Sequence, residues 1–361
     1  MPTRVLLLAG ELNLGGSERQ LTEIARGLDR TRFEPHVGAF VPQGLRADEL
    51  RRAGVPILHL PVHSLKSPAA LRGAQRLARY VRERKIDIVH SFDYPMNVFA
   101  IPVVRYFTSA LPVSSQRAHR DLTPPLHLRL LRQTDGMAAG IVVNCEFLRR
   151  HLMEDFKVPG DRIHLCYNGI DLEAFRAERH PQEELTVGVV CGLRPEKSLH
   201  TLLEAFALVG RGARLRIVGS GTELAGLQQR AADLGIAGQV CFQPATAEVP
   251  RVLGAIDIFV LPSRTEALSN ALMEAMACGC ACIASNVGGN PELIRREETG
   301  LLFEAGDAAA LAAQLRRLFE DAPLRRRLAK VGQEFVCRNF SLAASARRMA
   351  EIYDDLQRQA M

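Results

Sequence analysis

Two cations in the second half of the chain have the type and placement needed to hold a diphosphate. Arg194 and Lys197 lie in the turn Gly192–Lys197, between an expected strand and an expected helix. Positive charge beside the free amides of a helix start suits an anion. The alternative interpretation is a turn with two solvated charges. The hexapeptide alone does not decide between them.

Two glutamates further along the chain could bind the hydroxyls of a sugar or a ribose. Glu266 and Glu274 are separated by an expected helix start at Ser269 or Asn270, both of which are good N-caps. Glu274 then lies in the second helical turn, with its side chain leaning back toward the helix N-terminus. Glu266 lies in the loop before it. Taken in isolation, the pair could equally be two surface glutamates.

The elements that position these residues follow an alternating pattern. Short apolar runs separated by amphipathic stretches predict parallel sheets covered on both faces, a doubly wound α/β fold. The expected strands are 5–9, 36–41, 57–60, 86–90, 113–115, 141–143, 163–166, 185–191, 215–218, 240–242, 258–261, 281–284 and 301–303. Ser17 and Gln20 are spaced as a capping box at the start of the first helix.

The alternation breaks once, over residues 167–184, which predicts a domain boundary near residue 170. We therefore expect one domain over residues 1–170 and a second over residues 171–361. The amphipathic stretch 343–359 could pack back on either domain. Two such domains leave an interdomain cleft, where ligands lie beyond the carboxyl ends of the strands.

In combination these motifs resemble the retaining glycosyltransferase family 4, whose GT-B fold has two facing Rossmann-like domains. The resemblance covers essentially the whole chain and is strongest after residue 165. The N-terminal Gly15–Glu18 fits the family's glycine-rich first loop. The matching segments of the second half are 168–175, 192–197, 217–221, 257–263, 266–279 and 300–302.

The resemblance implies a role for each matched residue. Arg194 and Lys197 would neutralise the nucleotide diphosphate, which is the leaving group. Glu274 would hold the ribose, and Glu266 would bind the transferred sugar. The remaining implied contacts are Gly16 near the phosphates, Gly219 near the base, and the backbone amides of Leu268, Ser269 and Asn270 beside Glu266.

A histidine in the first half completes the expected site. His119 follows the expected strand 113–115, and family members often place a histidine there, facing the donor sugar. His90, also at a strand end, is the second candidate. No Asp-x-Asp motif occurs in the sequence, so we expect no metal and no cofactor, with arginine and lysine stabilising the departing phosphate.

Composition argues against a fibrous, disordered, secreted or membrane-spanning protein, and the charge distribution suggests a kind of partner. The chain of 361 residues is 47% hydrophobic and 24% charged, has no apolar run long enough for a membrane span, and has eight irregularly spaced cysteines. Residues 1–172 contain 24 Lys and Arg against 17 Asp and Glu, whereas the remainder has 22 against 23. A basic first half can attract an anionic lipid surface or substrate, or can simply be solvated.

Three further motifs have simpler explanations. Cys278, Cys280 and Cys282 have the spacing of small core residues rather than of metal ligands. The Gly219-Ser-Gly221 turn lacks the third glycine of a dinucleotide fingerprint, because residue 224 is leucine. The stretch 126–132 is either a helix on the first sheet or a segment lying on a membrane.

The sequence therefore predicts a retaining, metal-independent glycosyltransferase acting on a glycan or lipid-linked acceptor, in cell-surface polysaccharide or glycolipid synthesis. We expect it in the cytoplasm, either free or peripheral at the inner face of the membrane, with no nucleic-acid partner. The alternatives are a non-catalytic sugar-nucleotide-binding subunit, or an epimerase or phosphorylase on the same fold.

Overall fold

The computed structural model describes residues 2–120, 123–176, 184–209 and 212–360 and divides the chain into two compact units. Unit 1 comprises Met1–Gly169 together with Leu342–Met361, and unit 2 comprises Ile170–Ser341. The expected break over 167–184 lies partly outside the described residues. The chain thus leaves unit 1 after Gly169 and re-enters it at Leu342.

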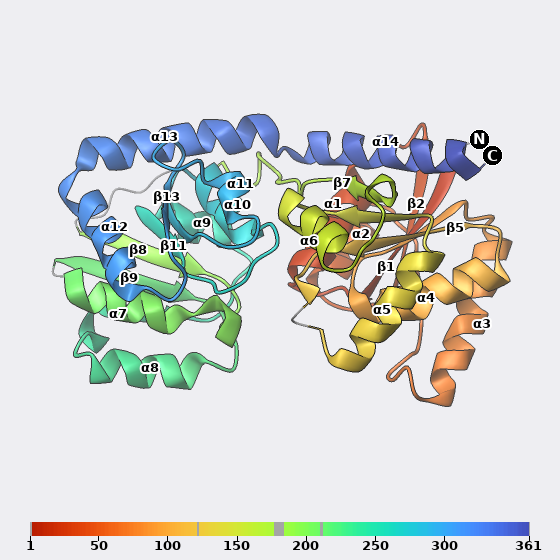
Figure 1. The fold of residues 1–361 in the computed structure, drawn as a ribbon, viewed down its shortest axis with the longest axis horizontal. Coiled ribbons are helices and arrows are strands. Elements are labelled where there is room, and N and C mark those ends of the chain that lie inside the picture. Colours follow the sequence, from red (N-terminus) through yellow and green to blue (C-terminus); the bar gives the residue numbers. More distant parts are fainter. Residues whose placement is uncertain (1, 121–122, 177–183, 210–211, 361) are drawn as a thin grey trace. The chain divides into compact units, whose positions relative to one another are not determined.

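Unit 1 is built on a parallel sheet of seven strands in the order β3-β2-β1-β4-β5-β6-β7 (Figure 1). The central strands β1 and β4 pair with Val5 beside Ile88. The strand order changes direction at this pair: β2 and β3 follow β1 toward one edge of the sheet, and β5 to β7 follow β4 toward the other edge. The strands are β1 (Thr3–Glu11), β2 (Phe33–Val41), β3 (Ile57–His59), β4 (Ile88–Ser91), β5 (Leu111–Gln116), β6 (Gly140–Val143) and β7 (Ile163–Leu165).

Helices cover both faces of this sheet because alternate residues of a buried strand point to opposite sides. Val5 and Leu7 of β1 pack in one core cluster, whereas Leu6 and Leu8 pack in another with Phe99. The helices of unit 1 are α1 (Gly16–Gly27), α2 (Leu45–Arg52), α3 (Pro68–Glu83), α4 (Tyr94–Phe107), α5 (Pro125–Met137), α6 (Glu146–Glu154) and α14 (Leu342–Ala360).

The C-terminal helix α14 is part of the core of unit 1. It packs against α1, and its buried residues Met349, Ile352 and Tyr353 belong to the same cluster as Val5 and Leu7 (Figure 1). Its amphipathic pattern is therefore satisfied by the first sheet, although some 170 residues of unit 2 intervene in the chain.

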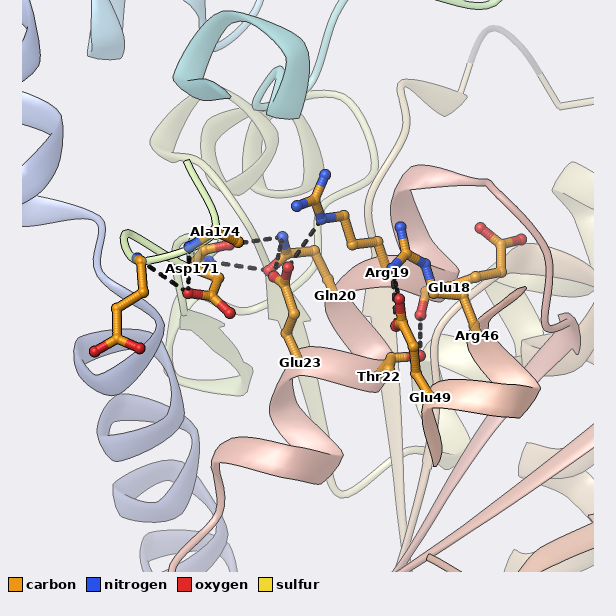
Figure 2. Close-up of polar contacts among 11 residues, drawn as sticks. Glu18, Arg19, Gln20, Thr22, Glu23, Arg46, Glu49, Asp171 and Ala174 are labelled. Atoms are coloured by element: carbon orange, nitrogen blue, oxygen red, sulfur yellow. Dashed lines mark hydrogen bonds and ion pairs between the residues drawn. The ribbon is translucent and has the colours of Figure 1, made fainter. Parts of the chain in front are cut away.

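The predicted capping box at the start of α1 is wrong. Gly15 is the N-cap and makes no side-chain capping bond. Gln20 instead holds the backbone of Gly169 with two hydrogen bonds of 2.9 Å, its amide donating to the carbonyl and its oxygen accepting from the N–H. It also donates to Glu23, which pairs with Arg19 (Figure 2). Gln20 therefore binds a buried residue far away in the sequence, Gly169, and does not cap the helix.

Unit 2 repeats the architecture with six parallel strands in the order β10-β9-β8-β11-β12-β13. The strands are β8 (Leu185–Val190), β9 (Ala213–Val218), β10 (Val240–Gln243), β11 (Ile258–Leu261), β12 (Ala281–Ser285) and β13 (Leu301–Phe303). The α-helices are α7 (Leu199–Val209), α8 (Leu224–Asp233), α9 (Val249–Gly254), α10 (Asn270–Ala277), α11 (Asn290–Leu293), α12 (Ala308–Glu320) and α13 (Ala322–Asn339).

Every strand expected from the sequence is present, shifted by at most three residues at its ends. The doubly wound α/β prediction is therefore confirmed for each unit. The stretch 126–132 forms part of α5, which packs against α4 with Leu131 buried and Leu126 exposed. Within the described ranges, every helix is too short or too polar to cross a membrane.

Candidate functional site

The candidate site of unit 2 lies at the carboxyl ends of its two central strands. β8 and β11 are parallel neighbours at which the strand order changes direction. β9 and β10 follow β8 toward one edge of the sheet, and β12 and β13 follow β11 toward the other edge. Loops that follow two such strands diverge to opposite sides and leave a crevice, the usual ligand position in a doubly wound sheet. The loop after β8 carries Arg194 and Lys197, and the loop after β11 carries Glu266.

Lys197 and Glu266 form a nearly buried ion pair across these two loops. The Lys197 Nζ lies 2.5 Å from Glu266 Oε1, and the side chains are 13% and 10% exposed. The Ser263 hydroxyl donates to the same carboxylate oxygen at 2.7 Å. Two residues separated by 69 positions in the sequence are thus brought into direct contact.

Arg194 is held differently, because its guanidinium is largely open to solvent. Its side chain is 61% exposed and pairs with the neighbouring Glu196 through Nε, at 2.8 Å. The carbonyl of Glu196 accepts from the Arg264 N–H, which ties the first loop to the second. A short 3₁₀ turn, Pro195–Lys197, precedes α7 here, so the predicted turn between a strand and a helix is confirmed. Arg194 therefore offers an accessible cation beside a buried one.

Helix α10 begins where the sequence predicted. Ser269 is the N-cap, and its hydroxyl accepts from the Leu272 N–H at 3.3 Å. Glu274 follows in the second turn and is 7% exposed. Leu268 and Ser269 are also buried, whereas Asn270 is half-buried. The predicted helix start and the position of Glu274 in the second turn are confirmed, and its predicted ligand stays a prediction.

Glycines allow two pairs of backbone segments to approach closely in the loops that carry the ion pair or lie next to it. A Cβ on Gly288, whose φ is +56°, would lie 1.8 Å from the Glu266 carbonyl oxygen. The Gly289 N–H donates to the Ala267 carbonyl. A Cβ on Gly219 would lie 1.8 Å from the Cys191 carbonyl oxygen, and this glycine is also at positive φ. Gly219 thus packs closely against the loop after β8, and the contact with a base that the resemblance implies stays a prediction.

Sequence reasoning missed the polar support beneath Glu266. The sequence motifs assign no role to Ser263, yet its hydroxyl binds the glutamate directly. Its carbonyl accepts from the Ser285 hydroxyl at 2.6 Å, and the Ser285 carbonyl accepts from the Asn290 amide at 3.1 Å. Ser263 lies two residues after β11, and Ser285 is the last residue of β12, so each hydroxyl is at the carboxyl end of a strand. That placement is the signal that could have identified them.

Four cysteines of unit 2 are wholly or partly shielded from solvent. Burial raises the pKa of the Cys191 thiol to about 12, with Lys197 opposing and Glu266 adding to the shift. Cys278, Cys280 and Cys282 are buried, and each donates to a backbone carbonyl. This agrees with their interpretation as small core residues.

In unit 1, the strand expected before His119 is present, whereas Gly16 lies in helix α1 and not in the loop that the resemblance implies. His119 follows β5 and stacks on the rings of His151 and Phe147 of α6. Gly16 is the first residue of α1. The second candidate, His90, is fully buried, with Tyr353 and Ser115 at its two ring nitrogens. Burial holds the pKa of His90 well below its usual value, so His90 is a neutral core residue and not a ligand-facing one.

Two parallel sheets with the 3-2-1-4-5-6 strand order, one of them with cations and carboxylates at its reversal point, define an α/β protein of the GT-B type. Family models agree with this class. The model "Glycosyl transferases group 1" matches residues 171–335, and the model "Glycosyltransferase Family 4" matches residues 14–174. The chain belongs to the family of group 1 glycosyl transferases.

Two relatives show how similar individual proteins are to this chain. The N-acetyl-alpha-D-glucosaminyl L-malate synthase of Bacillus anthracis is 30% identical over 211 residues, 55% of each chain. The GDP-mannose-dependent alpha-(1-6)-phosphatidylinositol monomannoside mannosyltransferase of Mycobacterium tuberculosis is 27% identical over 384 aligned positions, 97% of each chain. The first of these matches, like several others, spans only about half of the relative's length.

Solved structures confirm the fold. The crystal structure of Anabaena Alr3699/HepE in complex with UDP and glucose superposes with a TM-score of 0.88, at 20% identity, over 98% of this chain and 99% of that one. At this identity the likeness shows a shared fold.

Proposed function

We propose that the protein is a glycosyltransferase that moves a sugar from a nucleotide-sugar donor to an acceptor hydroxyl. The observation that carries the proposal is the Lys197–Glu266 pair at the reversal point of the second sheet, with the accessible Arg194 beside it. The names of the relatives, which include a mannosyltransferase dependent on GDP-mannose, support the same class of reaction.

The chemistry that these residues suit is departure of a nucleoside diphosphate. As the bond between the anomeric carbon and the phosphate oxygen breaks, negative charge grows on the diphosphate. Arg194 and Lys197 would stabilise that charge electrostatically, which lowers the barrier to departure. Glu266 and Glu274 would hold hydroxyls of the sugar and of the ribose. His119 and Gly16 would contribute from unit 1.

We further propose that transfer retains the anomeric configuration and needs no metal. In a front-face reaction, the acceptor oxygen bonds to the anomeric carbon on the side that the phosphate leaves, and the acceptor proton passes to the departing phosphate oxygen. No carboxylate nucleophile is needed for this step. The two cations supply the charge neutralisation that a metal would otherwise provide.

A transfer assay tests this proposal. Purified protein with EDTA is incubated with a panel of UDP-, GDP- and ADP-sugars and with glycan and lipid-linked acceptors, and product is followed by NMR. We expect one donor to give a product with the donor's anomeric configuration. Inversion would contradict the retaining mechanism, and a strict requirement for Mg²⁺ would contradict the metal-independent one.

The acceptor is proposed to be lipid-linked or anionic and to be met at the inner face of the cytoplasmic membrane. The exposed face of α3 presents Arg72, Arg76 and Arg79, none of which makes an ion pair within the described ranges. Tyr106 and Phe107 are 65% and 67% exposed at the end of α4. Basic and aromatic side chains together suit an anionic lipid surface, and no nucleic-acid partner is proposed.

Vesicle pelleting tests the membrane proposal. We expect more protein to pellet with vesicles of phosphatidylglycerol and phosphatidylcholine than with phosphatidylcholine alone, and the difference to shrink in a variant with Arg72, Arg76 and Arg79 changed to Gln. Equal binding to both vesicle types would overturn it.

A further inference from the structure

The loop that carries His119 is anchored on its C-terminal side by a buried ion pair. Arg120 is 1% exposed and binds both carboxylate oxygens of Asp135 at 2.8 Å. Its Nε donates to the Gln116 side chain at 3.1 Å. A bidentate pair of this kind fixes both distance and orientation. The backbone directly after His119 is thus immobilised, whereas the imidazole ring needs separate support.

That support comes from helix α6. The His119 ring lies on the His151 ring, with centroids 4.0 Å apart and planes inclined by 28°. Phe147, one turn earlier on the same face of α6, stacks beside it with its centroid 5.5 Å from that of His119. Two ring faces from one helix therefore define the plane of the His119 imidazole.

His151 is itself fixed on two sides. Its Nδ1 lies 2.6 Å from Asp155 Oδ2, and the Phe156 ring packs edge-on against it with centroids 5.1 Å apart. A carboxylate only accepts hydrogen bonds, so Nδ1 is assigned the hydrogen. The Phe156 ring is in turn covered by the guanidinium groups of Arg120 and Arg132. The His151 side chain is 6% exposed, so its ring has little freedom to turn.

We propose that His151, oriented by Asp155, is a positioning residue that sets the ring plane of His119 during glycosyl transfer. The inference rests on the proposed role of His119 at the donor sugar. The plane of an imidazole determines where its N–H groups and lone pair point, and misplacing a contact group by about 1 Å can cost about 10²-fold in rate. His151 acts through His119 and touches no reacting atom.

The test compares three changes by kcat and by donor KM. His151→Ala removes the stacking face, and we expect kcat to fall by about 10- to 100-fold. Donor KM should change less than about twofold, because the cations proposed to bind the diphosphate are in the other unit. His151→Phe preserves a flat ring but loses the contact with Asp155, so it should retain clearly more activity than His151→Ala. His63→Ala, an exposed histidine of the same unit, is the matched control and should change neither constant.

The decisive comparison is made in a His119→Ala background. If His151 acts only through His119, His151→Ala lowers kcat no further there. A full additional loss would overturn the proposal, as would a His151→Phe variant as impaired as the alanine variant. If His151→Ala does not fold, His151→Gln, which lacks a ring but keeps the volume, takes its place. An unchanged kcat in His119→Ala, with transfer abolished in Arg194→Ala, would reject this inference and leave the proposed donor site intact.

Discussion

Lys197 and Glu266 contribute to stability and to the proposed chemistry in ways that can be separated. Each is nearly buried, so each needs the other's charge in the absence of a ligand. In the proposed donor complex, the lysine also serves the diphosphate and the glutamate also serves a sugar hydroxyl. A single substitution therefore lowers both stability and donor binding, whereas a double substitution lowers donor binding alone.

We predict that Lys197→Met lowers the free energy of unfolding by about 1–3 kcal/mol, because a buried carboxylate loses its cation. The double variant Lys197→Met with Glu266→Gln should recover most of that stability, since Ser263 can still donate to the neutral amide. Nucleotide binding should stay lost in both. Urea unfolding and calorimetric titration measure the two properties, and restored nucleotide binding in the double variant would contradict the proposed site.

The sequence indicated the residue types of this site but not the contact between them. A turn with two cations and a pair of glutamates eight positions apart can be read directly from the sequence. The Lys197–Glu266 pair depends on β8 and β11 being neighbours, which strand order decides and periodicity does not show. The Ser263 contact needs no strand order, because Ser263 is three residues from Glu266 in the same loop, but a serine at a strand end does not by itself show which side chain it binds.

At the scale of elements, the loop after β12 supports the loop after β11. Gly288 has a φ of +56°, and its Cα faces the Glu266 carbonyl so closely that no side chain fits. This contact links a glycine outside the charged motifs to the position of the Glu266 backbone. Gly306 also has positive φ, at +83°, but a Cβ there would meet nothing within 4 Å.

Alanine at these two glycines should therefore have different effects. Gly306→Ala adds backbone strain alone, of about 1 kcal/mol, and should leave donor binding unchanged. Gly288→Ala adds the same strain and displaces the Glu266 loop, so we expect at least a tenfold loss of nucleotide-sugar affinity. Titration calorimetry on the folded variants checks this, and equal affinities would show that the loop contact does not matter for binding.

Helix α14 is joined to β4 by a buried polar contact that should make stability depend on pH. Tyr353 of α14 binds the Nδ1 of His90, and burial lowers the pKa of this histidine well below 6.5. His90 is thus neutral in the folded protein but takes up a proton when the chain unfolds in acid. Its contribution to stability is present above about pH 6.5 and is lost as the pH falls below that value.

We predict that His90→Gln removes about 1.4 kcal/mol of the stability difference between pH 7.5 and pH 5.5. The absolute stability of the variant should also be lower, because a packed ring is lost. His36 and His164, whose pKa values are also lowered by burial, contribute equally to both proteins. His63→Gln is the exposed control, and urea unfolding at the two pH values gives the comparison. Identical pH dependence in all three proteins would show that His90 does not titrate on unfolding.

At the scale of the whole molecule, unit 1 is assembled from two distant segments of the chain. The sequence showed that residues 343–359 form an amphipathic helix, but an apolar stripe does not identify the surface that covers it. The structure assigns this stripe to the first sheet through Met349, Ile352 and Tyr353. The alternation of strands and helices was predictable throughout, because each buried strand is a continuous apolar run.

Deletion of residues 342–361 should therefore destabilise unit 1 selectively, although the deletion lies beyond unit 2 in the sequence. Hydrogen exchange monitored by mass spectrometry should show faster exchange in β1, β2 and β4, while β8 and β11 keep their protection. Equal loss of protection in both sheets would contradict the division into two units, and unchanged exchange would contradict the core role of α14.

The central claim is that unit 2 binds a nucleotide-sugar through Arg194 and Lys197, and a thermal-shift panel of UDP, GDP, ADP and their common sugar conjugates tests it most directly. Arg194→Ala is the informative variant, because its side chain is 61% exposed and its removal should cost little stability. Arg214→Ala, which removes a 57% exposed arginine paired with Glu184 at the amino end of β9, is the matched control. A ligand at a hundred times its Kd stabilises the native state by about 2.7 kcal/mol. The account predicts a shift with one nucleotide that is unaffected by EDTA, kept in Arg214→Ala and lost in Arg194→Ala. A shift retained in Arg194→Ala, or none with any nucleotide, would contradict it.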